Sequence, residues 1–129
     1  MKISKIEAVV DAIAALNKYH QPDSLSYQLR SPLLIKSFAK PGKHEVTDEG
    51  LRIFDSGVGG YKAAVFDMGV KIKGESNAGL KSTDRLRNLL GVYGIKQEAD
   101  ILAVVYFLRK ALKDKDIDAL TPISYFDKK

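Results

Sequence analysis

The sequence predicts a mainly helical α+β fold in a single domain, and three observations lead to this prediction. Apolar residues recur every three or four positions over several segments, which is typical of amphipathic helices. The turn signal Lys40-Pro41-Gly42-Lys43 separates two short apolar runs, which indicates a β-hairpin. Because 129 residues is the usual size of one domain, we expect residues 1–129 to form one unit without an internal linker.

The first helix is expected over residues 3–18, where Ser4 followed three positions later by Glu7 fits a capping box. A polar loop that contains a proline ends this helix. Two short strands are expected at residues 33–38 and 51–54. A long, solvated hairpin connection joins them.

Three further helices are expected after the hairpin. The first begins behind the N-capping pair Asp55-Ser56 and ends at Gly74. The next covers residues 82–93, and the last covers residues 98–113. A short turn at Thr121-Pro122 then closes the chain.

The composition excludes several classes of site. The chain has no cysteine, which excludes disulfide frameworks, cysteine-based zinc sites and thiol nucleophiles. Its two histidines, His20 and His44, are expected in loops without a second ligand at helical spacing, so we expect no metal site and no cofactor. The sequence also lacks a phosphate-binding loop, a dinucleotide fingerprint and a calcium loop.

The charge balance favours anionic partners without selecting one. The chain carries 21 basic and 16 acidic residues, a net charge of +5, which suits nucleic acid or peptidoglycan. No stretch approaches the ~20 apolar residues of a membrane span. Glu7 and Asp11 interrupt any signal-peptide core near the N-terminus. We therefore expect cytoplasmic synthesis without a signal peptide.

A pattern in the middle of the chain points to a known family. Phe54, Ser56, Gly60 and Ala63 form Phe-x-Ser-x-x-x-Gly-x-x-Ala, after an amphipathic helix, a loop ending in residues 24–27 and a hairpin. This order resembles the small lysozyme-like muramidase or transglycosylase domains of phages and prophages, over nearly the whole chain. The resemblance implies a lysozyme-like domain with an N-terminal helix, a β-hairpin and three further helices.

The family's proline-centred loop motif is only partly kept. Pro32, Ile35 and Lys36 match it. The asparagines before the proline, and the Gly-Asn pair after it, are replaced here by Leu29, Arg30, Ser31, Leu33 and Leu34. Leu33 and Leu34, where polar residues are expected, indicate either a repacked core or a protein interface.

The general-acid position of the family is also changed. The resemblance places a glutamate at the C-terminal end of the first helix, and Asn17 occupies that place here. Glycoside hydrolysis needs a carboxylic acid to protonate the leaving oxygen, and an amide cannot supply that proton. We therefore expect a phage-type lysozyme-like protein without catalysis, acting as a structural or peptidoglycan-binding component of a virion or tail, with other phage structural proteins as alternative partners.

A second interpretation keeps an enzyme. Glu75 follows a helix end and precedes a serine, which resembles how goose-type lysozymes and soluble transglycosylases present their acid. An active muramidase or lytic transglycosylase using Glu75 requires this carboxylate to lie in a cleft, and an exposed Glu75 rules that role out. Glu45 and Glu49 on the hairpin are further candidates for a second carboxylate.

The resemblance also implies a sugar-binding groove between the first helix, the hairpin and the helix that begins near residue 55. Tyr19, Tyr27 and Tyr61 are expected to stack on sugar faces, although Tyr61 could instead belong to the core. Hydrogen bonds are expected from Ser31 and Lys36.

A third interpretation is a basic nucleic-acid-binding protein. Residues 83–113 could form a helix-turn-helix with basic residues on both helices. This interpretation predicts affinity for duplex DNA that falls steeply with salt.

Overall fold

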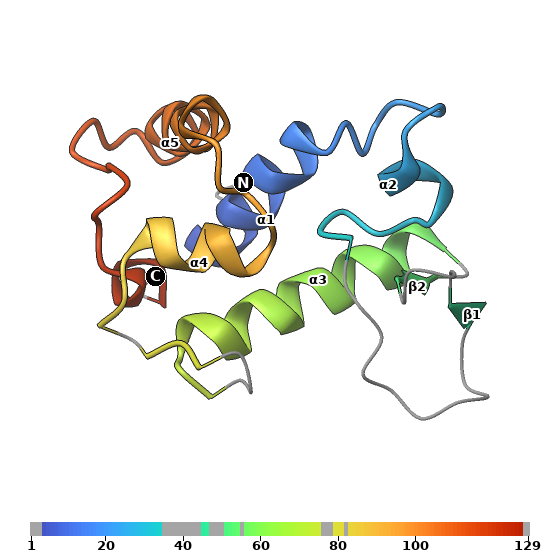
Figure 1. Cartoon of the computed structure of the whole chain (residues 1–129), viewed down its shortest axis with the longest axis horizontal. Helices are drawn as coiled ribbons and strands as arrows, with labels where there is room; N and C mark the ends of the chain where they lie inside the picture. The colour runs from blue at the N-terminus through green and yellow to red at the C-terminus, as the bar shows by residue number, and fades with distance from the viewer. Residues whose placement is uncertain are drawn as a thin grey trace.

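The computed structural model describes residues 4–34, 45–46, 51–54, 56–75, 79–81 and 83–127 (Figure 1). The expected mainly helical fold is confirmed, and the chain forms one small domain. The helices are α1 (Lys5–Leu16), α2 (Leu25–Gln28), α3 (Gly57–Ile72), α4 (Leu86–Val92), α5 (Glu98–Leu112) and the 3-10 helix η1 (Ile123–Asp127).

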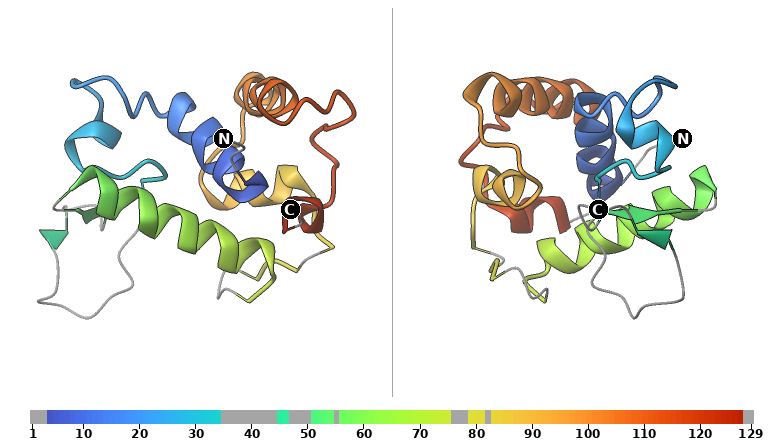
Figure 2. Two further views of the ribbon diagram at one scale, coloured as in Figure 1. Left: turned by 180° about the vertical axis from the view of Figure 1, so that it is seen from behind. Right: turned by 45° about the vertical axis from the view of Figure 1, so that its right-hand side comes forward.

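The first helix begins where its capping signal predicts. The Ser4 hydroxyl accepts the Glu7 backbone N–H at 3.0 Å, and the Glu7 carboxylate accepts the Ser4 N–H, so the capping box is complete. α1 then packs between α3 and α5 (Figure 2). Its side chains Val9, Val10 and Ile13 are fully buried there. α1 is therefore the centre of the hydrophobic core.

One of the two expected strands was predicted correctly, and the other, at residues 33–38, was wrong. β1 (Glu45–Val46) and β2 (Arg52–Ile53) pair antiparallel, and β2 falls inside the strand expected at residues 51–54. The partner strand was expected to start at Leu33. Leu33 instead lies in a turn with its side chain buried, because a short apolar run can equally be a core anchor in a loop. Residues 35–38, the rest of that expected strand, lie outside the described residues.

Helix α4 begins at Leu86, later than the start near residue 82 that the sequence predicts. It starts at Leu86 because Arg85 is extended and the residues beside it are hydrogen-bonded to the C-terminal segment. The Leu86 N–H donates to Thr121 O, and the Ile123 N–H donates to Asp84 O, both at 2.8 Å. Arg85 forms an isolated bridge with Pro122 in the same place. Pairing with a distant segment therefore takes precedence over the local capping residues.

Tyrosine hydroxyls tie several of these elements together. Three of them each donate a hydrogen bond to a carboxylate on a neighbouring element: Tyr61 to Asp11, Tyr93 to Asp67 and Tyr125 to Asp114. Burial is the main cause that raises the pKa of Tyr61 and of Tyr93. The bond to Asp114 is the main cause that raises the pKa of Tyr125 to about 12.

These tyrosines predict a loss of stability in alkali. A raised pKa in the folded state stabilises the protein fully below the ordinary tyrosine pKa of 10.0, and this contribution is lost as the pH rises through the folded value. Urea unfolding should therefore give a falling free energy of unfolding above about pH 10. Tyrosinate absorbance should show part of the six tyrosines ionising only on unfolding. Ionisation of all six near pH 10 in folded protein would contradict this prediction.

Candidate functional site

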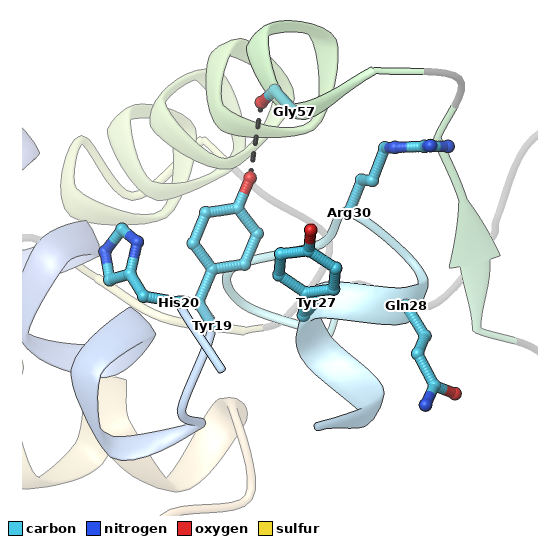
Figure 3. Close-up of a pocket in the computed structure, with 6 residues that line it drawn as sticks. All are labelled: Tyr19, His20, Tyr27, Gln28, Arg30 and Gly57. Carbon is cyan, nitrogen blue, oxygen red and sulfur yellow. Dashed lines mark hydrogen bonds between the residues drawn. The ribbon is translucent and has the colours of Figure 1, made fainter. Parts of the chain in front are cut away.

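A surface pocket of about 440 Å³ lies where the loop after α1, helix α2 and the start of α3 meet (Figure 3). Its lining residues are Tyr19, His20, Tyr27, Gln28, Arg30 and Gly57. Two of the three tyrosines expected to stack on sugars, Tyr19 and Tyr27, are therefore brought together here. In Figure 3 both hydroxyls point toward α3, with Arg30 beside Tyr27 on the side away from Tyr19.

The chain reversal at the end of α1 positions Tyr19. Lys18 adopts a left-handed conformation with φ of 58°, and the Tyr19 N–H donates back to Ala14 O at 2.9 Å. The Tyr19 hydroxyl then donates to Gly57 O at 3.4 Å, which spans the pocket from α1 to α3. Burial raises the pKa of Tyr19, and the charge of Arg30 opposes this shift.

Helix α2 positions Tyr27. Its N-cap Ser24 accepts the Tyr27 N–H at 3.0 Å and donates its own hydroxyl to Lys18 O at 2.7 Å. The same serine thus joins α2 to the turn that carries Tyr19. About half of the Tyr27 side chain, 47%, stays exposed, so its ring is open to a ligand.

The segment after α2 is held against α3 by backbone contacts. The Phe54 N–H donates to Leu29 O at 3.0 Å. Arg30 has a φ of 53°, and its carbonyl lies directly on Gly60 of α3. A Cβ atom at Gly60 would be 1.7 Å from that oxygen, so only glycine fits. The glycine of the Phe-x-Ser-x-x-x-Gly-x-x-Ala pattern therefore fixes the wall of the pocket.

Asn17 has a structural bond in this arrangement. Its Nδ2 donates to Pro32 O at 2.9 Å and connects the end of α1 to the loop that crosses α3. An ionised carboxylate at this place has no proton to donate to a carbonyl. Asn17 therefore holds the end of α1 to this loop through its side chain.

The charge of the pocket is positive. Arg30 is cationic, and none of the described lining residues is an aspartate or a glutamate. Protonation of a glycosidic oxygen needs such an acid. The described part of the pocket can therefore hold a ligand by stacking and hydrogen bonding, and it does not contain the acid that would cleave a sugar.

Glu75 does not line this pocket, and it lies at the far end of α3. α3 ends in front of Gly74, whose φ is 76°, and the Glu75 N–H donates to Val70 O at 3.0 Å. The Glu75 side chain is exposed. It stands at the opposite end of α3 from Gly57, about 25 Å away at 1.5 Å per residue. A catalytic acid needs a partly buried carboxyl group, and the exposed Glu75 does not meet this requirement.

The other expected site residues lie elsewhere. Tyr61 is half-buried, bonds to Asp11 at 2.8 Å and does not line the pocket. Ser31 is fully buried, and its backbone carbonyl accepts the Ser26 hydroxyl at 2.6 Å, so it cannot meet a surface ligand. Lys36, His44, Glu49 and the side chain of Glu45 lie outside the described residues.

Sequence reasoning missed four of the six lining residues as site residues: His20, Gln28, Arg30 and Gly57. His20 was expected to be a plain surface histidine, and it packs edge-on against Tyr19 with ring centroids 5.3 Å apart. Gln28 and Gly57 were not singled out as ligand contacts. His20 and Gln28 could have been suggested by their places in the sequence, because each is next to a tyrosine that was expected to bind a sugar. Gly57 faces Tyr19 only in the folded chain.

The second helix of the expected nucleic-acid motif begins with negative charge. The first turn of α5 holds Glu98 and Asp100, where a recognition helix would approach DNA phosphates. Arg87 of α4 is also engaged, because two of its nitrogens donate to the Glu98 carboxylate. This arrangement gives no support to nucleic-acid binding by these helices.

No described helix is long and apolar enough to cross a membrane. The described residues contain no group of three or more histidine or acidic side chains placed to hold a metal ion. Comparison with protein-family models, with curated proteins and with solved structures finds no match to this chain.

Proposed function

We propose that this chain is a lysozyme-like domain that has lost its catalytic glutamate and binds glycan strands of peptidoglycan, as a structural or binding component of a phage virion or tail. The observation that carries the proposal is the pocket itself. It joins Tyr19 and Tyr27 with Arg30, and no described carboxylate lines it.

The pocket has the surface properties of a sugar site. Tyrosine offers an apolar ring for stacking and a hydroxyl for hydrogen bonding, which matches the two kinds of surface on a sugar. A few polar groups around an apolar floor are the usual composition of a ligand pocket. Gln28, His20 and Arg30 supply such groups beside the two rings.

The missing acid supports binding in place of cleavage. The Asn17 side-chain N–H donates a hydrogen bond to Pro32 O, so the position that would carry the acid holds the loop instead. Loss of one catalytic group leaves the fold and the binding surface intact, because function depends on a few side chains placed on a scaffold.

The lysozyme-like part of the proposal is supported by the role of the family pattern. Phe54, just before α3, bonds to Leu29 O, and Gly60 of α3 contacts Arg30 O, so both hold the segment after α2 beside the start of α3. Ser56 caps α3 by accepting the Gly59 N–H at 3.0 Å. Three of the four positions of the pattern therefore have defined structural roles around the pocket wall.

Titration with soluble peptidoglycan fragments or N-acetylglucosamine oligomers, followed by NMR, tests the proposal. We expect saturable shifts at the pocket residues and about a fivefold weaker affinity for Tyr27→Ala, since loss of an aromatic contact costs on the order of 1 kcal/mol. Tyr106→Ala is the matched control, because Tyr106 is a 61% exposed tyrosine on α5 that does not line the pocket.

Mass spectrometry of purified peptidoglycan after incubation separates binding from catalysis. We expect no released sugar fragments from the wild type or from Glu75→Gln. Release that disappears in Glu75→Gln would establish an enzyme and overturn the proposal. Absence of any glycan binding, together with salt-sensitive binding of duplex DNA, would favour the nucleic-acid interpretation.

A further inference from the structure

We infer that the pocket selects glycans whose sugar carries a carboxylate, and that Arg30 is the residue that determines this specificity. The inference rests on the proposed function, because it names the chemistry of the ligand in the same pocket. Arg30 stands where the resembling family has an asparagine, so the cation is a property of this chain.

The backbone of Arg30 is fixed on both sides. Its N–H donates to Tyr27 O at 3.0 Å, and its carbonyl lies against Gly60 without room for a side chain between them. Its left-handed conformation, with φ of 53°, is held by these two contacts. The side chain therefore starts from a defined point beside the Tyr27 ring (Figure 3).

The guanidinium has donors left for a ligand. Its one described hydrogen bond is from Nη1 to Phe54 O, at a long 3.4 Å. The two ion pairs found among the described residues join Lys71 to Asp67 and Arg87 to Glu98, and neither includes Arg30. A guanidinium has five N–H donors, so a fork of two remains for the two oxygens of a carboxylate.

Arg30 and Tyr27 line the same pocket, so both can contact one ligand. In the close-up the Arg30 side chain starts beside Tyr27, on the side away from Tyr19, and extends away from the Tyr27 ring (Figure 3). A sugar ring stacked on Tyr27 therefore lies in the same pocket as the guanidinium. A carboxylate attached to that ring would meet a cation with no described acid nearby to compete. A neutral sugar cannot form this ion pair, so the acidic sugar binds more tightly.

Three disaccharides test the inference, each titrated into the full chain by calorimetry or NMR. They are N,N′-diacetylchitobiose, which is neutral, N-acetylglucosaminyl-N-acetylmuramic acid, which adds a lactyl carboxylate, and N-acetylglucosaminyl-glucuronic acid, which carries the carboxylate on the ring. We expect an acidic disaccharide to bind roughly three- to tenfold more tightly than chitobiose, the range of an exposed but forked ion pair. This preference should shrink as salt rises.

Two substitutions of Arg30 and one control complete the test. Arg30→Gln should weaken the binding of the acidic disaccharides by roughly three- to tenfold more than that of chitobiose, so that the preference disappears. Arg30→Lys should keep part of the preference, because lysine supplies a point charge without the fork of two donors. Lys110→Gln removes an exposed cation of α5 that does not line the pocket, and it should change nothing. Circular dichroism checks that each variant is folded.

The outcomes separate this inference from the proposed function. If no disaccharide binds, the proposed function fails. If acidic and neutral disaccharides bind equally, or if Arg30→Gln weakens both equally, the inference fails and the proposed function stands. Displacement of the acidic disaccharide by an equal concentration of acetate would show a simple anion site and would also overturn the inference. The better of the two acidic disaccharides identifies the source of the carboxylate.

Discussion

Replacing Gly60 by alanine should lower the free energy of unfolding by about 3 kcal/mol or more, at the upper end of overpacking effects. The added Cβ would stand 1.7 Å from Arg30 O and 2.9 Å from the carbonyl carbon. Both are backbone atoms, so no side-chain rotation relieves the clash. Either α3 or the segment after α2 must move, and the hydrogen bond from Phe54 N to Leu29 O, which holds the same segment, is strained with it.

Urea unfolding of Gly60→Ala measures this effect, and Gly91→Ala is its control. Gly91 lies in α4, and an added Cβ there meets nothing within 4 Å. Alanine at Gly91 should therefore stabilise the chain by about 0.5–1 kcal/mol through helix propensity alone. A Gly60→Ala variant as stable as Gly91→Ala would show that the segment after α2 does not rest on α3. Because that segment carries Arg30, Gly60→Ala should also weaken glycan binding.

The helix boundaries that could be predicted are those set by local chemistry. Ser4 and Ser56 cap the helices that follow them, and Gly74 ends α3 in a left-handed conformation, as expected. α2 was not predicted, because four residues are too few for an apolar period to show. The start of α4 was misplaced, because Arg85 pairs with Pro122, a residue 37 positions later that no local pattern indicates.

The candidate site was predictable only where the resemblance reached. Tyr19 and Tyr27 were expected to bind a ligand, and both line the pocket. Tyr61 was expected there too, yet its partner Asp11 lies on α1, so the tyrosine serves the packing of two helices. Ser31 was misplaced because its burial depends on how the loop closes. In the sequence Arg30 was only a departure from the family's motif. Its place in the pocket depends on the contact of its carbonyl with Gly60, which is 30 residues away in the sequence.

Removal of the Asp67 carboxylate should cause a second large loss of stability, beside that of Gly60→Ala. Lys71 Nζ lies 2.5 Å from Asp67 Oδ2, the Tyr93 hydroxyl donates to the same oxygen, and the ammonium is 4.8 Å from the centre of the Tyr93 ring. Lys71 is only 8% exposed, which is rare for lysine and requires a paired charge. Asp67→Ala leaves this ammonium buried and the tyrosine hydroxyl without its acceptor.

We expect Asp67→Ala to cost about 2–4 kcal/mol in urea unfolding, below the full value for a buried pair, because a quarter (25%) of the Asp67 side chain is exposed. The stranded charge is the main cause, so removing it should restore stability. Asp67→Ala/Lys71→Met should recover more than half of the loss, since methionine fills the same space without a charge. If the double variant is no better than Asp67→Ala, the bond to Tyr93 is the dominant contribution. If Asp67→Ala costs less than about 0.5 kcal/mol, the lysine has reached water and the cluster does not hold α3 to α4.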